Sequence, residues 1–174
     1  MDTPSARIGW TVRTERLLLR PISTDDAEEM AAIYADPEVA RFVHGLDLEA
    51  TRAQLARWQE EWWKRGLGTF AIVDPTTGDF LGRAGVKHWE EFDFTEVGWV
   101  LRRDLWSRGY ATEAGRASLD FAFANSDLDR ITAIIADGND ASVVVARRLG
   151  MEPWREQVMF GMKCTIYAAR RPVG

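Results

Sequence analysis

A basic segment that leads through a glycine into a predicted helix is the part of the sequence best suited to bind an anion. Residues 108–112 read RGYAT and lie between a predicted strand at 97–101 and a predicted helix at 111–124. Gly109 permits backbone angles that a side chain would forbid. The first amides of a helix have no partner inside the helix and carry partial positive charge, which suits a phosphate or pyrophosphate.

Three arginines, Arg102, Arg103 and Arg108, add full positive charge near this segment. A planar guanidinium can hold two phosphate oxygens at once. Turns of the strand–glycine–helix type are nevertheless common, and most bind nothing, so the local physics leaves both interpretations open. The segment has neither the Gly-Lys-Ser/Thr of a Walker loop nor the Gly-x-Gly-x-x-Gly dinucleotide fingerprint.

A second pair of polar residues, Asn139 and Ser142, lies where a loop at 137–140 meets a predicted helix at 141–149. Asn139 can end a strand and offer its amide to a ligand, and Ser142 falls in the first turn of the helix. Both residue types are also standard helix caps. From these two residues alone, capping is the better explanation.

Two motifs resemble the GNAT acyltransferases. Residues 106–114, WSRGYATEA, are similar to motif A of that family, and more narrowly to the ribosomal-protein N-acetyltransferases of the RimJ/RimL type. Trp106 stands where the general pattern has Gln or Arg, as is common in that branch. The sequence NDAS at 139–142, followed by RRLGM at 147–151, resembles the family's Asn-x-x-Ser…Leu-Gly-Phe segment.

The resemblance implies transfer of an acetyl group from acetyl-CoA to an amine. The loop amides would hold the pyrophosphate of acetyl-CoA, and a splayed strand at 97–101 would bind its pantetheine arm and acetyl carbonyl. Asn139 would contact coenzyme A and Ser142 would protonate the departing thiolate, whereas Tyr110 is expected only to pack in the loop. The residues expected to bind acetyl-CoA are Val100, Leu101, Arg102, Arg103, Arg108, Gly109, Tyr110, Ala111, Thr112, Asn139 and Arg147.

Glu96, at the start of the splayed strand, is the expected general base, because relatives often have an acidic residue near this position. The alternative is that Glu96 is only an exposed carboxylate on a strand. A base must lie within hydrogen-bond reach of the proton that it removes, and the sequence alone does not establish this. Weaker candidates for the base are His88, Glu90, Glu91 and Asp93.

The sequence departs from the family near its C-terminus. Many relatives carry an acidic or His-Asp pair before the last strand, whereas here residues 161–167 read GMKCTIY. Cys164 occupies roughly that position, and its expected role is that of a small buried hydrophobe. The function that the family assigns to the missing acid, and with it the identity of the acceptor, stays open.

Length and composition narrow the class of protein. The 174 residues, 46% of them hydrophobic, predict one domain over 1–174, with 1–9 as a loose leader. The net charge of −5 argues against a general nucleic-acid binder and mildly favours a cationic amine acceptor through electrostatic steering. One cysteine and two histidines form no convincing metal cluster, so no metal is expected.

No apolar run in the sequence approaches transmembrane length, and no signal peptide is evident. We therefore expect a cytoplasmic protein that does not contact a membrane. Whether the protein forms a homodimer is not decided by the sequence.

The pattern of apolar residues predicts the order β, α, α, β, β, β, α, β, α, β, β. This order predicts an α/β fold with a partly antiparallel sheet of about seven strands flanked by about four helices, and it matches the GNAT order along nearly the whole chain. Trp58 and Trp62 fall on one face of a predicted helix at 48–64, where core packing is the expected role. The predicted strands cover 11–21, 69–73, 80–89, 95–101, 130–136, 152–158 and 159–168, and the other main helix follows a cap at Ser23 or Thr24.

The leading hypothesis is therefore an acetyl-CoA-dependent N-acetyltransferase that acts on a protein N-terminus or a small-molecule amine. The alternative is a GNAT-like module that binds acyl-CoA as a sensor or interaction domain without turnover. A third hypothesis is an acyltransferase for longer acyl chains. Glu96, Asn139 and Ser142 favour an enzyme over the sensor.

Overall fold

The computed structural model describes residues 8–43 and 45–172, and within them the chain forms one sheet of eight strands. The strands are β1 (Val12–Arg13), β2 (Leu18–Pro21), β3 (Thr69–Val73), β4 (Phe80–Trp89), β5 (Phe94–Leu101), β6 (Arg130–Ala136), β7 (Glu152–Met159) and β8 (Met162–Arg170). They lie in the order β1-β2-β3-β4-β5-β6-β8-β7. Adjacent strands are antiparallel except for β5 and β6, which are parallel.

Five α-helices accompany the sheet in the described part of the chain. They are α1 (Ala27–Tyr34), α2 (Pro37–Ala40), α3 (Leu48–Arg65), α4 (Tyr110–Ala124) and α5 (Asp140–Arg148). The predicted mixed α/β fold is confirmed, with slightly more strands and helices than the sequence predicts. None of the described helices is long and apolar enough to span a membrane.

The N-terminal region differs from the expectation. The predicted strand at 11–21 is divided into β1 and β2 by a turn in which the Thr14 backbone N–H donates to the Leu17 carbonyl at 2.9 Å. The predicted loose leader at 1–9 is wrong at its end, because Ile8–Trp10 form a 3₁₀ helix. The Trp10 ring packs on Trp62 with 5.3 Å between ring centroids, which fixes this segment. Residues 1–7 of the expected leader lie outside the described part.

Helix α3 has clear start and stop signals. The Asp47 carboxylate accepts a hydrogen bond from the Ala50 N–H at 2.8 Å, and the helix ends at Gly66 in the left-handed conformation, with φ 65°. Trp58 and Trp62 are buried, which confirms the predicted core stripe. Trp62 also donates its indole N–H to the Thr69 carbonyl at 2.7 Å, so its polar atom is satisfied inside the core.

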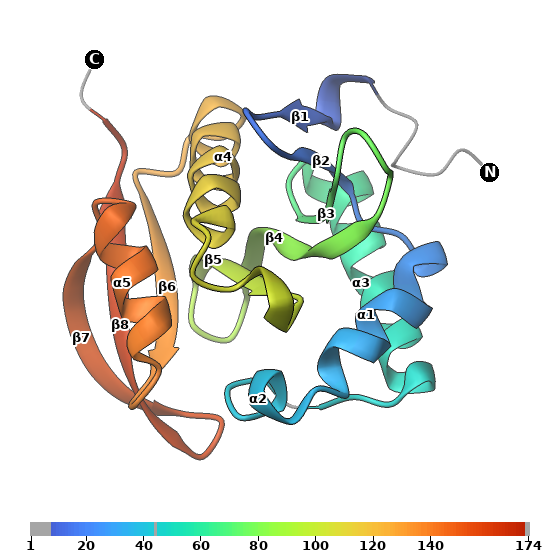
Figure 1. Ribbon diagram of the computed structural model, residues 1–174. Helices are drawn as coiled ribbons and strands as arrows, with labels where there is room; N and C mark the ends of the chain where they lie inside the picture. Colours follow the sequence, from blue (N-terminus) through green and yellow to red (C-terminus); the bar gives the residue numbers. More distant parts are fainter. Residues whose placement is uncertain (1–7, 44, 173–174) are drawn as a thin grey trace.

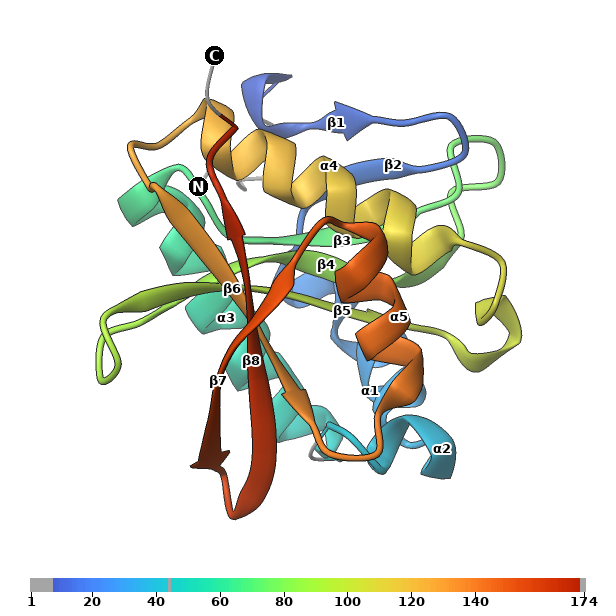
Figure 2. The ribbon, with the colours of Figure 1, turned by 90° about the vertical axis from the view of Figure 1, so that its left-hand side faces the viewer.

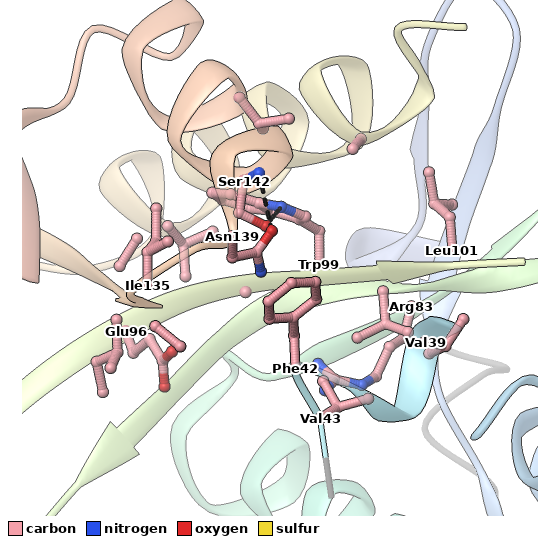
Figure 3. A pocket seen from close by; sticks show the side chains of 18 of the residues that line it. Val39, Phe42, Val43, Arg83, Glu96, Trp99, Leu101, Ile135, Asn139 and Ser142 are labelled. Atoms are coloured by element: carbon pink, nitrogen blue, oxygen red, sulfur yellow. Dashed lines mark hydrogen bonds between the residues drawn. The ribbon is translucent and has the colours of Figure 1, made fainter. Parts of the chain in front are cut away.

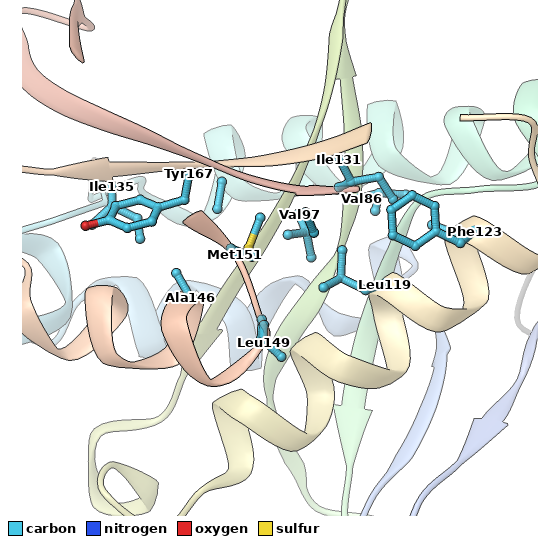
Figure 4. Packing of buried hydrophobic residues seen from close by; sticks show 13 residues of the cluster. Val86, Val97, Leu119, Phe123, Ile131, Ile135, Ala146, Leu149, Met151 and Tyr167 are labelled. Atoms are coloured by element: carbon cyan, nitrogen blue, oxygen red, sulfur yellow. The ribbon is translucent and has the colours of Figure 1, made fainter. Parts of the chain in front are cut away.

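The helices cover the two faces of the sheet. Helices α4 and α5 lie on one face, and α1, α2 and α3 lie on the other (Figure 1). Figure 4 shows the core on the first face, where Leu119 and Phe123 of α4 meet Val97 of β5. On the second face, Met30 and Leu55 pack beside Val100.

Strand β5 serves both faces because its side chains alternate. Val97 and Trp99 belong to the core beneath α4 and α5, whereas Val100 belongs to the core beneath α1 and α3. Glu96 and Gly98 share the face of Val100 by the same alternation.

Strands β5 and β6 pair only briefly. Their register contains a single pair, Glu96 with Thr132, and the Thr132 hydroxyl donates to the Thr95 carbonyl at 3.1 Å. Beyond this pair the two parallel strands diverge (Figure 2). The N–H and C=O groups on this side of β5 beyond Glu96 therefore need partners other than β6.

Candidate active site

A cavity of about 980 Å³ lies where β5 and β6 diverge. It is lined from both faces of the sheet, by residues of α1 to α3 on one side and by the start of α4 and of α5 on the other. Figure 3 shows Trp99, Asn139 and Ser142 on one side of the cavity and Glu96 and Arg83 on the other. A cavity of this size accommodates a large organic ligand.

The loop before α4 forms one end of the cavity, as Gly109, Tyr110, Ala111 and Thr112 all line it. Gly109 is the N-cap of α4 and has φ 80°, a backbone angle that residues with a side chain rarely adopt. No side chain forms a capping hydrogen bond at this end of the helix. The first intrahelical bond runs from the Glu113 N–H to the Gly109 carbonyl at 3.0 Å. The amides before Glu113 are therefore available to an anion.

The Thr112 hydroxyl adds independent support for an anion at this position. Its oxygen is buried and has no hydrogen-bond partner, the only such side-chain atom among the described residues. Buried polar atoms without partners are rare and need an explanation. A phosphate oxygen at the start of α4 would provide the missing partner, so the residues present fit a pyrophosphate-bearing ligand.

Arg16 and Glu113 hold this loop in place from outside. Glu113 accepts hydrogen bonds from the Arg16 backbone N–H at 2.8 Å, from Arg16 Nε at 2.7 Å and from the Thr14 hydroxyl at 2.6 Å. Arg16 Nη1 also donates to the Arg108 carbonyl at 2.9 Å, and its guanidinium lies 4.3 Å from the centroid of the Tyr110 ring. The sequence analysis missed this clamp, because no local signal links residues so far apart in the chain.

Burial alone would raise the pKa of Glu113, but the hydrogen bonds from Thr14 and Arg16 outweigh it and hold this pKa below its usual value. The carboxylate is therefore ionised at neutral pH and remains paired with Arg16.

The three predicted arginines near the loop lie outside the cavity. Arg102, Arg103 and Arg108 are exposed and do not line the cavity. Arg102 instead binds Asp104 through Nε at 2.7 Å and Nη2 at 2.9 Å, and this hydrogen bonding lowers the pKa of the Asp104 carboxyl.

Of the two arginines at the end of α5, Arg148 lines the cavity and the predicted Arg147 does not. Arg148 also lines a shallow depression together with Gly109 and Thr112. The helical turn of about 100° per residue points these neighbours in different directions. Arg148 therefore lies beside the loop, as does Arg116 of α4, which lines the same depression. Val100 and Leu101, also predicted to bind the ligand, do line the cavity.

Asn139 and Ser142 meet at the start of α5. The Asn139 side-chain oxygen accepts a hydrogen bond from the Ser142 backbone N–H at 3.2 Å, so Asn139 does cap the helix. Its amide nitrogen lies on the side away from Ser142, toward the cavity (Figure 3). Capping and ligand binding are therefore compatible in this residue.

The Ser142 hydroxyl also has a partner on β5. Trp99 Nε1 donates to Ser142 Oγ at 3.3 Å. Because the oxygen already accepts from the indole, the hydroxyl proton remains free to be donated into the cavity.

Glu96 lies at the opposite side of the cavity, where Trp89 Nε1 donates to its Oε2 at 2.6 Å. Burial raises the pKa of the Glu96 carboxyl, while the bond from Trp89, the charges of Arg83 and Lys87 and the Ile134 backbone N–H oppose this rise. The net shift is upward, which is the direction expected for a carboxylate that takes up a proton near neutral pH.

The weaker candidates for the base lie away from the cavity. Glu90, Glu91 and Asp93 are exposed in the β4–β5 connection, and none of them lines the cavity. His88 does not line it either, and its Nδ1 lies 3.3 Å from the Thr95 hydroxyl. Cys164 is buried as expected and does line the cavity.

No cluster of three or more His, Cys, Asp or Glu side chains suited to a metal ion occurs among residues 8–43 and 45–172.

Comparisons with known proteins agree with this geometry. The family model described as acetyltransferase (GNAT) domain matches residues 16–152. The uncharacterized protein YkkB of Bacillus subtilis (strain 168) is 32% identical over 142 residues, which cover 79% of this chain and 83% of YkkB.

Two solved structures illustrate the shared fold. A crystal structure of an acetyltransferase from Agrobacterium tumefaciens (strain C58) has a TM-score of 0.80 and 31% identity, and the match covers 92% of this chain and 94% of that one. RimL, a ribosomal α-N-protein acetyltransferase solved in complex with coenzyme A, has a TM-score of 0.77 at 15% identity, with 92% and 97% of the two chains covered. At this identity, the likeness to RimL concerns the fold alone.

Proposed function

The chain belongs to the GNAT acetyltransferase family, and from this premise we propose that it transfers an acetyl group directly from acetyl-CoA to a primary amine. One observation carries the proposal: a single cavity connects the α4 loop, suited to a pyrophosphate, with the half-buried carboxylate of Glu96, suited to accept a proton. The gap between β5 and β6 joins the two ends.

Acetyl-CoA supplies the activated acyl group, as a thioester. The residues at the start of α4 bind its phosphates, with Thr112 Oγ1 and the free amides as donors and Arg148 as the neighbouring cation. The backbone groups of β5 that do not pair with β6 hold the pantetheine arm and the thioester carbonyl. The binding energy is thus spread along the cavity from the loop to the strand.

Glu96 and Ser142 handle the protons in this proposal. Glu96 accepts a proton from the ammonium group of the acceptor, directly or through a water molecule, so that the amine lone pair is free to attack. Ser142 donates its hydroxyl proton to the departing thiolate sulfur, supported by the hydrogen bond that its oxygen accepts from Trp99. Asn139 keeps Ser142 at the cavity by capping α5 and offers its amide nitrogen to coenzyme A.

A half-buried Glu96 with a raised pKa, in the same cavity as Ser142, favours turnover over the alternative of an acyl-CoA sensor, because binding alone needs no base. The sequence motif at 106–114 supports the RimJ/RimL-type branch, and the likeness to RimL supports the shared fold. The acceptor in this proposal is a primary amine of a protein N-terminus or of a small molecule.

The test is a calorimetric titration with acetyl-CoA, followed by measurement of free thiol released in the presence of a panel of amines and peptides. Stoichiometric binding with amine-dependent thiol release supports the transferase. Binding without release on any acceptor supports the sensor, and absence of binding contradicts the assignment of the α4 loop.

A further inference from the structure

The half of the cavity beneath α1 and α3 has an excess of positive charge. Arg57 of α3 and Arg83 and Lys87 of β4 line this half, whereas the net charge of the whole chain is −5. None of these three cations lies within ion-pair distance of a carboxylate in the part of the chain that the structure describes. A local basic site thus occurs on an acidic protein.

The carboxylates nearby do not neutralise these cations. Glu38 pairs with Arg41 at 3.2 Å, and Glu96 is held by Trp89. Burial raises the pKa of Glu96, which disfavours its negative charge. Glu96 acts on Arg83 and Lys87 through its charge, but no carboxylate of the described residues forms an ion pair with them.

Arg83 is fixed in an orientation suited to bind a ligand. Its Nε donates to the Tyr34 hydroxyl at 3.0 Å, and its guanidinium lies 4.8 Å from the centroid of the Trp58 ring. These contacts hold the planar group while leaving its Nη1 and Nη2 atoms without a carboxylate. Figure 3 shows the guanidinium beside Phe42 and Val43 at the cavity.

The register of β4 and β5 sets the spacing between Arg83 and Glu96. Lys87 pairs with Glu96, Gly85 with Gly98, and Arg83 with Val100, so two glycines form the floor between the carboxylate and the guanidinium. A Cβ atom built on Gly98 would contact only Arg83 Nη1, at 3.8 Å. Glu96 and Gly98 are two residues apart, or about 7 Å along the strand. An amine at Glu96 and an anion at Arg83 would therefore lie on the same face of the sheet, over the two glycines.

We propose that the acceptor is a small amine that also carries an anionic group, a carboxylate or a phosphate, and that Arg83 binds this anion. The inference rests on the proposed function, since it assumes that the amine is acetylated beside Glu96. Lys87 and Arg57 add positive potential on either side of Arg83. The guanidinium, with two free nitrogens in one plane, suits both anions.

The experiment compares acceptors that differ only in the anion. L-leucine is compared with L-leucinamide, and phosphoethanolamine with ethanolamine, by acetyl-CoA-dependent thiol release. We expect the anionic member of at least one pair to have a kcat/KM about tenfold to a hundredfold higher, in line with a charge-assisted hydrogen bond. The pair that shows the difference distinguishes carboxylate from phosphate.

Substitution of Arg83 tests whether this residue causes the preference for the anionic amine. Arg83→Met should abolish the preference, mainly through a higher KM for the anionic amine, and should act on the uncharged amine only through the pKa of Glu96, which the charge of Arg83 lowers. Arg83→Lys should retain part of the preference. The matched control is Arg41→Met, which removes the same charge from an exposed arginine outside the cavity and should preserve the preference.

A second readout is independent of turnover: calorimetric titration of each amine into the protein saturated with coenzyme A. Binding of the anionic member that is weakened by Arg83→Met supports the anion site. The inference is overturned if both members of every pair bind or react equally, if neither binds, or if only peptides are acetylated. Thiol release with uncharged amines alone would overturn this inference while leaving the proposed transferase intact.

Discussion

The indole N–H of Trp99 donates to the hydroxyl oxygen of Ser142 at 3.3 Å, across the space between β5 and α5. This contact links the strand expected to hold the acetyl group with the residue expected to protonate the leaving thiolate. It occupies one acceptor position of the Ser142 oxygen and leaves the hydroxyl proton available for donation.

Ser142→Ala should lower kcat by about 10²- to 10⁴-fold, the usual contribution of a general acid, with little change in the Kd for acetyl-CoA. The helix cap survives, because Asn139 accepts from the backbone N–H of residue 142. Trp99→Phe should lower kcat by a smaller factor, and adding it to Ser142→Ala should have no further effect on kcat. Steady-state kinetics and calorimetry measure these quantities. An unchanged kcat in Ser142→Ala would reduce Ser142 to a structural residue of α5.

Thr112→Val should weaken acetyl-CoA binding about ten- to a hundredfold, since a hydrogen bond to a charged group contributes about 1.5–3 kcal/mol. The free protein should be at least as stable as the wild type, because the Thr112 hydroxyl oxygen is buried without a partner. Calorimetry with acetyl-CoA and thermal unfolding without it measure the two effects. A loss of stability in the free protein, with unchanged affinity, would show that the hydroxyl serves the fold.

Glu113→Gln should loosen the α4 loop and weaken acetyl-CoA binding. It should also lower the free energy of unfolding at neutral pH by about 1–2 kcal/mol, as expected for charged hydrogen bonds that are only partly buried. The lowered pKa of Glu113 means that its contribution to stability is present at neutral pH and is lost as the pH falls through that pKa. The difference in Tm between wild type and variant should therefore shrink in acid. A pH-independent difference would contradict the charged pairing with Arg16.

Glu96→Gln should remove the rise of kcat/KM with increasing pH, because the base must be deprotonated to work and its pKa is raised by burial. The raised pKa of Glu96 has the opposite effect on stability: activity increases with pH, whereas the stability of the folded protein decreases. A carboxyl whose pKa is higher in the folded state makes unfolding easier as the pH rises through that range, and the neutral amide does not. The variant should thus gain Tm relative to the wild type with increasing pH. A pH–rate profile that keeps its rising limb in Glu96→Gln would direct attention to another base.

Much of the fold could be predicted from local patterns. The predicted strands at 69–73, 80–89 and 130–136 match β3, β4 and β6, and the predicted helix at 48–64 ends one residue before α3 does. Residues 109–112 of the predicted loop line the same cavity as Asn139 and Ser142. These features depend on residues close together in the chain.

The parts that could not be predicted depend on tertiary contacts. Arg16 meets Glu113 only because β2 and α4 are neighbours, and the choice of Arg148 over Arg147 depends on the rotation of α5. The positive charge in the half of the cavity beneath α1 and α3 depends on the β4–β5 register, which brings Arg83 and Lys87 to one face of the sheet. The net charge of the chain pointed toward a cationic acceptor, but the residues that line the cavity determine the local potential.

The central claim is direct transfer of the acetyl group between two ligands in one cavity, and a single-turnover experiment with isotopically labelled acetyl-CoA tests it most directly. Protein in excess is mixed with labelled acetyl-CoA and the amine that gives the fastest thiol release, and mass spectrometry locates the label. The account predicts that the label appears on the amine nitrogen in step with thiol release and that the protein carries none at any time. Label on the protein, or label only in free acetate, would contradict it.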